Sequence, residues 1–308
     1  MKIAYRALAA GVLSYVLPRY RGIQHHPHDA RYFYSVFLRH LVSLHDAGAM
    51  PHRGTVAELG PGNALGFGLA ALLSGWQTYQ AFDVAAFASA EENRGVLAGL
   101  IELFTQRAPI PDDGEMPNVY PKLQGYAFPS HVLADEQLTA ALAPARIEAL
   151  QRSLAEGSGI IKYSAPWLDA SVLQANTIDW VASQAVLEHV DAPVAAWNAI
   201  AAWLKPGGVT THSIDFRSHG FTPQWNGHWA CSDLEWRLLV GKRIYSLNRA
   251  SVSDHRQMIA DAGLDVLQWN PDFTSGGVAR SDLAARFRKL SDDDIRTSGV
   301  FVIARKSA

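Results

Sequence analysis

The residues best suited to bind a ligand stand in the segment from Val56 to Gly66, VAELGPGNALG. Gly60 and Gly62 follow a short β-rich run, and small residues at a strand-to-helix turn let the backbone approach a bound nucleotide closely. Asp83 ends the next β-rich run, where a carboxylate can accept hydrogen bonds from both hydroxyls of a ribose. The combination predicts a loop that binds a nucleoside, with an acid that holds its sugar.

Two positions in the same loop argue against a dinucleotide. A dinucleotide-binding fingerprint needs its third glycine at position 65, but Leu65 stands there and the glycine comes one residue later, at Gly66. Glu58 adds an acid beneath the loop, which would repel a pyrophosphate and favour a ligand that carries an ammonium or a sulfonium. An oxidoreductase on this architecture is therefore disfavoured.

A second group of polar residues follows the later β-rich runs. Asp215 ends one run and His219 comes shortly after it, so the carboxylate could orient the imidazole and stabilise the imidazolium that proton abstraction forms. His189 follows another run, and we interpret it either as a base or acceptor contact or as a residue that orients its loop. His212 stands inside a run, where we expect a buried structural residue. The group suits general-base catalysis on a hydroxyl.

Short β-rich runs alternate with helical stretches from residue 54 onward, which predicts an α/β fold with a largely parallel sheet. Strands are expected at about 55–59, 78–84, 160–164, 178–183, 209–215, 264–269 and 300–305. Helices are expected at about 64–73, 86–106, 136–155, 193–204, 253–262 and 282–290. Asn63 is placed to cap the first of these helices. In such a sheet, ligands bind outside the carboxyl ends of the strands, where the glycine loop, Asp83 and Asp215 fall.

Three segments resemble motifs of one family. Residues 58–66 have the spacing E-x-G-x-G-x-x-x-G of its first motif, and residues 178–190, IDWVASQAVLEHV, look like its fourth-strand motif. Residues 203–208, WLKPGG, are similar to its turn before the fifth strand. The family is the class I methyltransferases that depend on S-adenosylmethionine (SAM). The matches run in the family's order over residues 54–215.

The resemblance implies a Rossmann-like α/β fold, with a seven-stranded mostly parallel sheet, an antiparallel C-terminal strand and helices on both faces. It also implies SAM as cofactor and S-adenosylhomocysteine as product. By the resemblance, residues after the third strand lie near the adenine, and residues ending the fourth strand face the methionine part. The implied cofactor-binding residues are Glu58, Gly60, Gly62, Asp83, Val84, Ser164, Ala165, Ser183 and Gln184.

Composition limits the partners. Twenty-seven Lys and Arg against 29 Asp and Glu leave a formal net charge of −2, whereas a duplex nucleic-acid binder usually has a clear basic excess. We therefore expect no nucleic-acid partner. The single cysteine, Cys231, can form no internal disulfide and leaves no cysteine cluster for zinc. An Asp–Asp–Asn metal site is not recognisable either, so we predict no metal ligand and metal-independent chemistry. The oligomeric state stays open.

The predicted organisation is a helical N-terminal extension over residues 1–50 and a methyltransferase domain over residues 51–308. The domain carries insertions at about 107–136 and 216–250. The first holds five prolines, which indicates an ordered loop or lid. The second is rich in aromatic residues, whose faces either suit a sugar or an aromatic acceptor or cover the edge of the sheet; for Trp236 we expect the latter.

The amino terminus allows two interpretations. The apolar run over residues 7–17 is too short to span a bilayer, and we favour a helix packed over the main core. The alternative is an amphipathic helix on a membrane surface, because residues 1–22 carry basic residues at both ends. No clear cleavage site follows the run, so we expect a cytoplasmic protein, with peripheral membrane contact through residues 1–22 as the alternative.

The leading hypothesis is transfer of the SAM methyl group, by in-line displacement at the sulfonium, to a hydroxyl of a glycan or small molecule. The stretch HSIDF at 212–216, with residues 248–249 and 262–264 further on, is loosely similar to methyltransferases of surface-polysaccharide and glycan synthesis. Two alternatives stay open: methyl transfer to nitrogen or carbon of a small molecule, and a SAM-binding scaffold without catalysis. The catalytic candidates are Asp215, His219 and His189.

Overall fold

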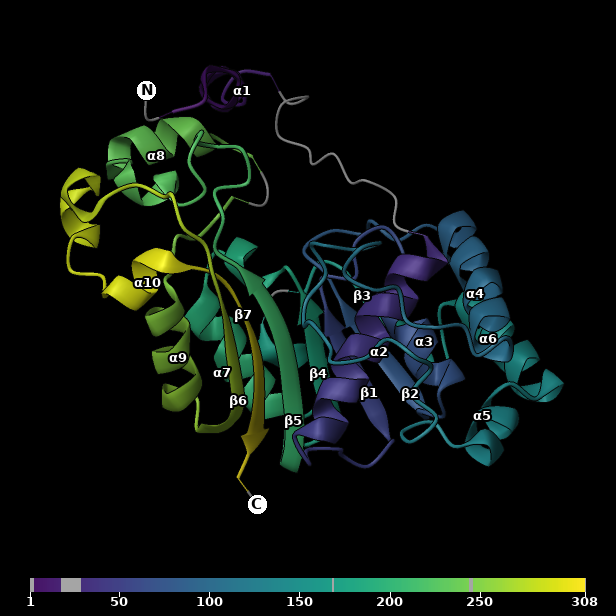
Figure 1. Ribbon diagram of the computed structural model, residues 1–308. Coiled ribbons are helices and arrows are strands. Elements are labelled where there is room, and N and C mark those ends of the chain that lie inside the picture. The colour runs from purple at the N-terminus through teal and green to yellow at the C-terminus, as the bar shows by residue number, and fades with distance from the viewer. Residues whose placement is uncertain (1–2, 18–28, 168, 244–245, 308) are drawn as a thin grey trace.

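The structure is a computed structural model that describes residues 3–17, 29–167, 169–243 and 246–307 (Figure 1). The seven strands in these ranges form one sheet in the order β3-β2-β1-β4-β5-β7-β6. They are β1 (Thr55–Leu59), β2 (Thr78–Phe82), β3 (Ile161–Ser164), β4 (Ile178–Gln184), β5 (Leu204–Asp215), β6 (Leu264–Phe273) and β7 (Thr297–Lys306). β7 runs antiparallel to β5 and β6, and the other neighbours pair in parallel. The predicted Rossmann-like sheet is confirmed.

Helices cover both faces of the sheet, as predicted, because the side chains of each strand alternate between two apolar cores. Trp180 and Ala182 of β4 face the core that includes α2, α3 and α4, and Val181 faces the core of α7 and α9. The helices are α1 (Tyr5–Leu13), α2 (Ala30–Asp46), α3 (Gly66–Leu73), α4 (Ala90–Thr105), α5 (Asp135–Ala141), α6 (Pro144–Glu156), α7 (Pro193–Trp203), α8 (Asp233–Val240), α9 (Val252–Asp261) and α10 (Asp292–Arg296).

The order of the strands brings the loops of interest to one edge of the sheet. β1 lies next to the central strand β4, with β2 and β3 on one side of β1 and β4 and β5 on the other. The register pairs Leu59, the last residue of β1, with Phe82 of β2 and Ser183 of β4. The loops that follow these three strands are therefore neighbours, and the point where the strand order reverses is where such sheets bind ligands.

Several predicted boundaries are wrong in detail. α3 begins at Gly66 without a side-chain cap, and the side-chain amide of Asn63 donates to Glu92 of α4 instead. α4 begins later than expected because Ser89 caps it there. β5 begins at Leu204, so the predicted turn before it is part of the strand. The short basic helix expected at 282–290 is replaced by separate 3₁₀ turns.

α2 is an element that the sequence did not single out. Asp29 caps it by accepting a hydrogen bond from the Tyr32 amide (2.9 Å). Its apolar side chains, Phe37, Leu38 and Leu41 among them, are buried in the core that it shares with α3 and α4. α2 is therefore part of the layer that covers the sheet. The division into residues 1–50 and 51–308 stays a prediction.

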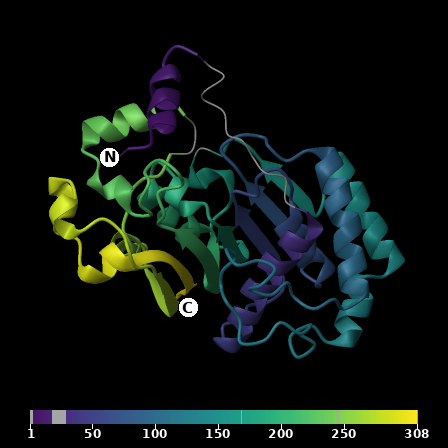
Figure 2. The ribbon, with the colours of Figure 1, turned by 45° about the horizontal axis from the view of Figure 1, so that its top comes forward.

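α1 lies apart from the main core. Figure 2 shows it beside α8, away from the helices that cover the sheet. Residues of both helices form a third apolar cluster with Phe221 and Leu247. A helix is confirmed over most of the expected run, but it packs on α8 rather than over the main core. No helix in the described ranges is both long and apolar enough to cross a membrane.

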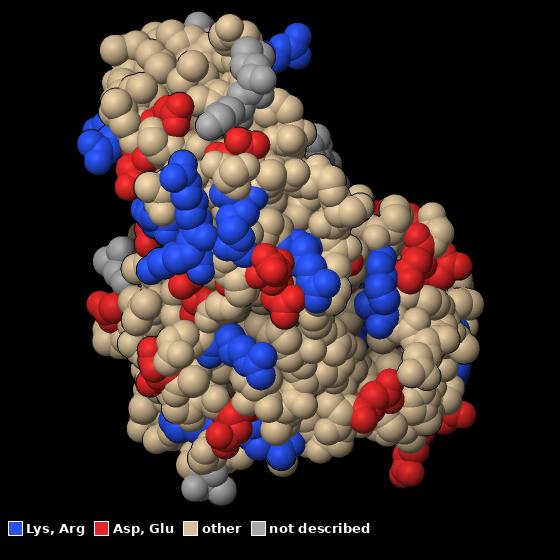
Figure 3. Space-filling view, turned by 60° about the vertical axis from the view of Figure 1, so that its left-hand side comes forward, with Lys and Arg blue, Asp and Glu red and all other residues tan. Residues whose placement is uncertain are grey.

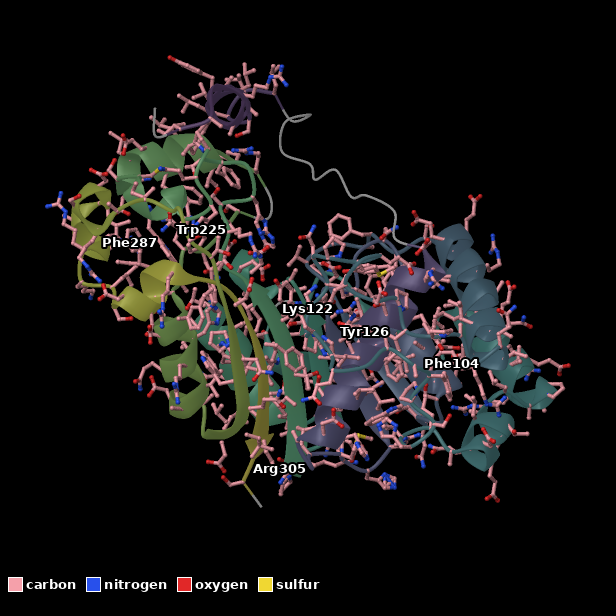
Figure 4. All side chains as sticks on the ribbon, in the orientation of Figure 1. Phe104, Lys122, Tyr126, Trp225, Phe287 and Arg305 are labelled. Carbon is pink, nitrogen blue, oxygen red and sulfur yellow. The ribbon has the colours of Figure 1, made fainter. Side chains whose placement is uncertain are left out.

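The predicted insertion at 107–136 has no helix or strand before α5, and Arg39 of α2 holds it in place. The Arg39 side chain is fully buried, and its Nη1 atom lies 3.0 Å from Asp113 Oδ1. The guanidinium also donates to the backbone oxygens of Pro111 (2.8 Å), Val119 (3.0 Å) and Pro121 (3.1 Å). Tyr126 of the same segment lies beside α2, with its ring under the guanidinium (Figure 4). Buried hydrogen bonds thus order this insertion.

Arg39→Met should destabilise the protein by about 3 kcal/mol, because it leaves buried carbonyl oxygens without donors. Chemical denaturation of the full chain measures this free energy of unfolding. Arg107→Met is the matched control, since Arg107 pairs with Asp135 at the surface; it should cost less than about 1 kcal/mol. Equal losses in the two variants would contradict an anchoring function for Arg39.

Candidate active site

The turn after β1 contains two glycines with different functions. Gly60 and Gly62 have φ angles of +66° and +71°, which glycine adopts without strain. A Cβ atom at Gly60 would lie 2.5 Å from Val186 Cγ2, so this position lets the turn pack against the loop after β4. A Cβ atom at Gly62 would have no neighbour within 4 Å. The backbone at Gly62 therefore borders open space in which a ligand can approach it.

Asp83 faces this turn from the end of β2. Its Oδ2 atom accepts a hydrogen bond from the Gly62 amide (3.2 Å), and its Oδ1 atom accepts one from the Val84 amide (2.7 Å). Each carboxylate oxygen can accept a second hydrogen bond, which is what two ribose hydroxyls require. The side chain is buried, and Val84 is exposed beside it. The geometry fits the predicted contact to ribose.

Glu58 lies beneath the turn, inside the core. Its carboxyl is buried and accepts a hydrogen bond from the Tyr79 hydroxyl. Burial raises the pKa of Glu58 to about 8, against an opposing effect of the Tyr79 hydrogen bond, and the charge of Asp83 adds to the rise. A carboxyl with this pKa is mostly neutral at pH 7, which weakens the argument that it attracts a sulfonium. A cofactor contact for Glu58 stays a prediction.

Ser164 and Ala165 lie where β3 ends, next to Asp83. The Asp83 amide donates to the Ser164 carbonyl (3.1 Å), and the Trp167 amide donates to the Asp83 carbonyl (3.0 Å). The backbone of residues 164–167 is therefore hydrogen-bonded to the backbone of the predicted ribose-binding acid. This places Ser164 and Ala165 beside Asp83, on the side to which the adenine is assigned; their contact with the cofactor stays a prediction.

Ser183 and Gln184 end β4, and their side chains point to different partners. Ser183 Oγ lies 2.7 Å from His212 Nδ1, whereas Gln184 Oε1 lies 3.1 Å from His40 Nε2. His212 is fully buried in this contact, which confirms the structural residue expected there. His40 of α2 carried no sequence signal, and burial lowers its pKa to about 4. It acts as a neutral hydrogen-bonding group that ties α2 to the end of β4.

Asp215 and His219 meet at the end of β5. His219 Nε2 lies 3.3 Å from Asp215 Oδ2, and the two side chains keep 28% and 30% of their area exposed. Burial alone would raise the pKa of Asp215, but the hydrogen bond and charge of His219, together with Arg217, lower it below its usual value. His219 has a φ angle of 46°, and strained backbone of this kind is common at functional sites. The structure brings this predicted pair together where solvent reaches it.

His189 lies against the same pair. The centroids of its ring and the His219 ring are 4.9 Å apart. Burial, and then the charge of His219, lowers the pKa of His189 to about 4, so it is neutral near pH 7. Glu188 beside it is deeply buried, and burial raises its pKa well above the usual value. Glu188, His189 and His219 each offer one metal-ligating atom within 4.8 Å of the others; the absence of a metal ligand stays a prediction.

Three residues that the sequence did not reveal join the second half of the chain to the first insertion at this place. Arg217 Nη1 lies 3.5 Å from Asp215 Oδ1, and its Nη2 lies 2.9 Å from Asp272 Oδ2. The hydroxyl of Tyr120 donates to the same Asp272 oxygen (2.9 Å). Lys122 lies over the Tyr120 ring. The insertion is thus linked to Asp215, the partner of His219, through Tyr120, Asp272 and Arg217.

The aromatic residues of the second insertion are largely internal. Trp236 of α8 is buried against Phe221, as expected for a residue that covers the fold. Trp229 is fully buried, and its indole donates to the Arg249 carbonyl (3.1 Å). Only Trp225 among the three tryptophans from 225 to 236 is partly exposed. The sugar-stacking interpretation is therefore limited to Trp225.

Residues 133–211 match a family described as a methyltransferase domain. This match spans β3 and β4 and ends within β5, beside the site described above. This part of the chain is similar to a methyltransferase domain, and methyltransferase activity with SAM as cofactor follows from that similarity. The observed strand order is Rossmann-like, as such an enzyme requires. Gly62, whose backbone borders open space, and Asp83 at the end of β2 remain the predicted contacts to the adenosyl group. No curated protein matches the sequence.

Solved structures with similar folds are distant in sequence. A putative sarcosine dimethylglycine methyltransferase from Galdieria sulphuraria is 13% identical, with 87% of this chain and 84% of that chain covered and a TM-score of 0.45. A putative methyltransferase from Haloferax volcanii, solved with the activator Trm112, is 16% identical (91% and 94% covered, TM-score 0.42). A SAM-dependent methyltransferase from Mesorhizobium loti is 13% identical (86% and 96% covered, TM-score 0.41).

Asp83→Ala should weaken SAM binding to the methyltransferase by at least about tenfold, because two ribose hydroxyls lose their acceptor. Isothermal titration calorimetry with SAM measures the affinity, and a thermal melt shows whether the variant is folded. Asp261→Ala, at the exposed end of α9, is the control and should bind SAM as the unaltered chain does. Unchanged affinity in Asp83→Ala would remove the ribose assignment.

Glu58→Gln should change how stability depends on pH. Between its ordinary pKa of 4.5 and the folded value of about 8, Glu58 keeps a proton in the folded state that the unfolded chain has lost. The unaltered protein therefore loses stability as pH rises through this window, and the glutamine variant lacks that loss. The free energy of unfolding of the variant should gain about 3 kcal/mol relative to the unaltered protein between pH 5 and pH 8. Parallel profiles in denaturation at both pH values would contradict a buried, proton-holding Glu58.

Proposed function

We propose that this methyltransferase modifies a hydroxyl group of a glycan or another small molecule. The observation that carries the proposal is the contact between His219 and Asp215, at the carboxyl end of β5 and partly open to solvent. A hydroxyl acceptor must lose a proton during methyl transfer, and an imidazole paired with a carboxylate is a suitable base. An amine acceptor needs only to be neutral, so it would give such a pair no obvious use.

The residues of the site would divide the work as follows. His219 takes the proton of the acceptor hydroxyl, and Asp215 stabilises the imidazolium that results. Arg217 keeps Asp215 ionised and oriented, since it donates to the carboxylate from its backbone amide (2.8 Å). His189, neutral near pH 7, contacts the His219 ring and limits its orientation. SAM, when bound, supplies the activated methyl group and leaves as S-adenosylhomocysteine.

The surroundings of His219 support an acceptor rich in hydroxyls. Asp272 and Arg217 are only partly buried, with 28% and 35% of their side chains exposed. The hydroxyl of Tyr120, in the first insertion, donates to Asp272. Polar groups of this kind can pair with several hydroxyls, and Trp225 nearby in sequence offers a partly exposed aromatic face. These features favour a sugar over an apolar acceptor.

The remaining expectations are part of the same proposal. Methyl transfer needs no metal ion here, and the acceptor is a small molecule or glycan rather than a nucleic acid. We place the protein in the cytoplasm, with peripheral membrane contact through residues 1–22 as the alternative.

Incubation of the full chain with cell extract and SAM carrying an isotope-labelled methyl group tests the proposal directly. Mass spectrometry of the products should find the label on oxygen of a hydroxyl-bearing compound. His219→Ala should lower the rate of label incorporation by about a hundredfold or more, because the base is lost, while SAM affinity by calorimetry stays the same. His131→Ala, an exposed histidine elsewhere, is the control and should keep full activity.

Three outcomes would contradict the proposal. Label on nitrogen or carbon would exclude O-methylation, and no labelled product at all would favour a SAM-binding scaffold. Normal turnover of His219→Ala would remove His219 as the base and leave Asp215 without its proposed partner in catalysis.

A further inference from the structure

α1 is fixed to α8 by a closely packed inner face. Gly11 has backbone of Leu239 directly against it, where any larger side chain would collide. The Lys242 amide donates to Ser14 Oγ (2.7 Å), and the Arg243 guanidinium donates to the Ala7 carbonyl (3.2 Å). These contacts fix the rotation of α1 about its own axis. The side chains on the opposite face of α1 therefore keep a constant orientation relative to α8.

The opposite face of α1 is apolar as well. Tyr5, Ala9 and Val12 are all exposed, and their spacing of four and three residues places them on one side of α1; Val16, in the turn that follows α1, is exposed as well. Tyr5 and Val16 each expose 72% of their surface. α1 thus differs from an ordinary surface helix, whose outer face is polar.

Exposed apolar side chains are concentrated on this part of the molecule. In the described residues eleven large apolar side chains are exposed, and six of them lie on or next to α1 and α8. These six, which we call the α1/α8 face, are Tyr5, Val12, Tyr15, Val16, Leu234 and Leu238. The lobe built from α1 and α8, at the top of Figure 3, is accordingly mostly uncharged surface. Such a concentration marks an interaction site.

Three basic side chains border the α1/α8 face. Arg6, Arg237 and Lys242 are exposed on or beside the two helices. The acids of α8 are already engaged, since Asp233 pairs with Arg249 and Glu235 caps its own helix. In the sequence, residues 1–22 contain four basic residues and no acidic one. An apolar face with a basic rim is complementary to a lipid surface with anionic headgroups.

We propose that the α1/α8 face docks on an anionic lipid surface, with the apolar side chains inserted among the lipids and the basic residues at the headgroups. A second copy of the chain fits less well, because a two-fold interface on this face would bring Arg6, Arg237 and Lys242 of both copies together. The docked lobe adjoins the proposed acceptor site, since Phe221 of its apolar cluster follows His219 closely in the chain. Docking would hold that site near the membrane surface.

Vesicle flotation with the full chain tests the proposal. The unaltered protein should float with vesicles of phosphatidylcholine and phosphatidylglycerol, and not with phosphatidylcholine alone, and added salt should weaken the binding. The triple variant Tyr5→Ser, Val12→Ser, Val16→Ser should bind the anionic vesicles at least about tenfold more weakly. The control Val172→Ser, Val194→Ser, Leu267→Ser removes three exposed apolar side chains elsewhere and should bind as the unaltered protein does.

Calorimetry with SAM and a thermal melt show that all three proteins are folded, and SAM affinity should be the same in each. Equal flotation of the two triple variants, or no flotation of the unaltered chain, would overturn the proposal. A dimer in analytical ultracentrifugation that only the α1 variant converts to a monomer would also overturn it, because the face would then join two copies. None of these outcomes bears on O-methylation, which the labelled-methyl assay tests separately.

Discussion

The contact between Gly60 and Val186 is the constraint on which the site depends. It joins the turn after β1 to the loop after β4, at the point where the order of the strands reverses. Because no side chain fits at Gly60, the two loops can meet only if that residue is glycine. In the same turn Gly62 faces open space, and Asp83, at the end of β2, accepts a hydrogen bond from the Gly62 amide. Close packing at Gly60 therefore holds the turn that carries the predicted cofactor contacts against the loop after β4.

The acceptor side is organised by charge rather than by close packing. Arg217 lies between two carboxylates, Asp215 and Asp272, and offsets the repulsion that would otherwise push them apart. Its position leaves one edge of Asp215 to His219. The Asp215–His219 pair is therefore part of a network that extends to Asp272 of β6 and, through Tyr120, to the first insertion. A substitution of any residue in this network is therefore expected to shift the position of the His219 imidazole.

The sequence predicted the features that depend on nearby residues in the chain, namely the strands and the short motifs at their ends. It missed the side-chain contacts between residues that are far apart in the chain. Gly60, Gly62 and Asp83 stand in short motifs at strand ends, and β-rich runs predicted the sheet. These residues could therefore be proposed as the cofactor side of the site from the sequence alone. The contact of Arg217 with Asp272 spans 55 residues and that of Tyr120 with Asp272 spans 152. His40, from a helix whose bounds the sequence did not define, reaches Gln184. For Asn63 the sequence predicted a local contact that does not form. Asn63 is a residue type that often caps helices, but its side chain bonds to Glu92 of α4 instead.

The anchoring of the first insertion by Arg39 also affects how an acceptor is chosen. The carbonyl oxygens of this segment already accept hydrogen bonds from a buried guanidinium, so the segment is held in one conformation before any ligand binds. Little ordering entropy is then lost on association, and discrimination follows from fit to a fixed contour. Binding of an acceptor beside this segment would therefore not require the segment to fold first.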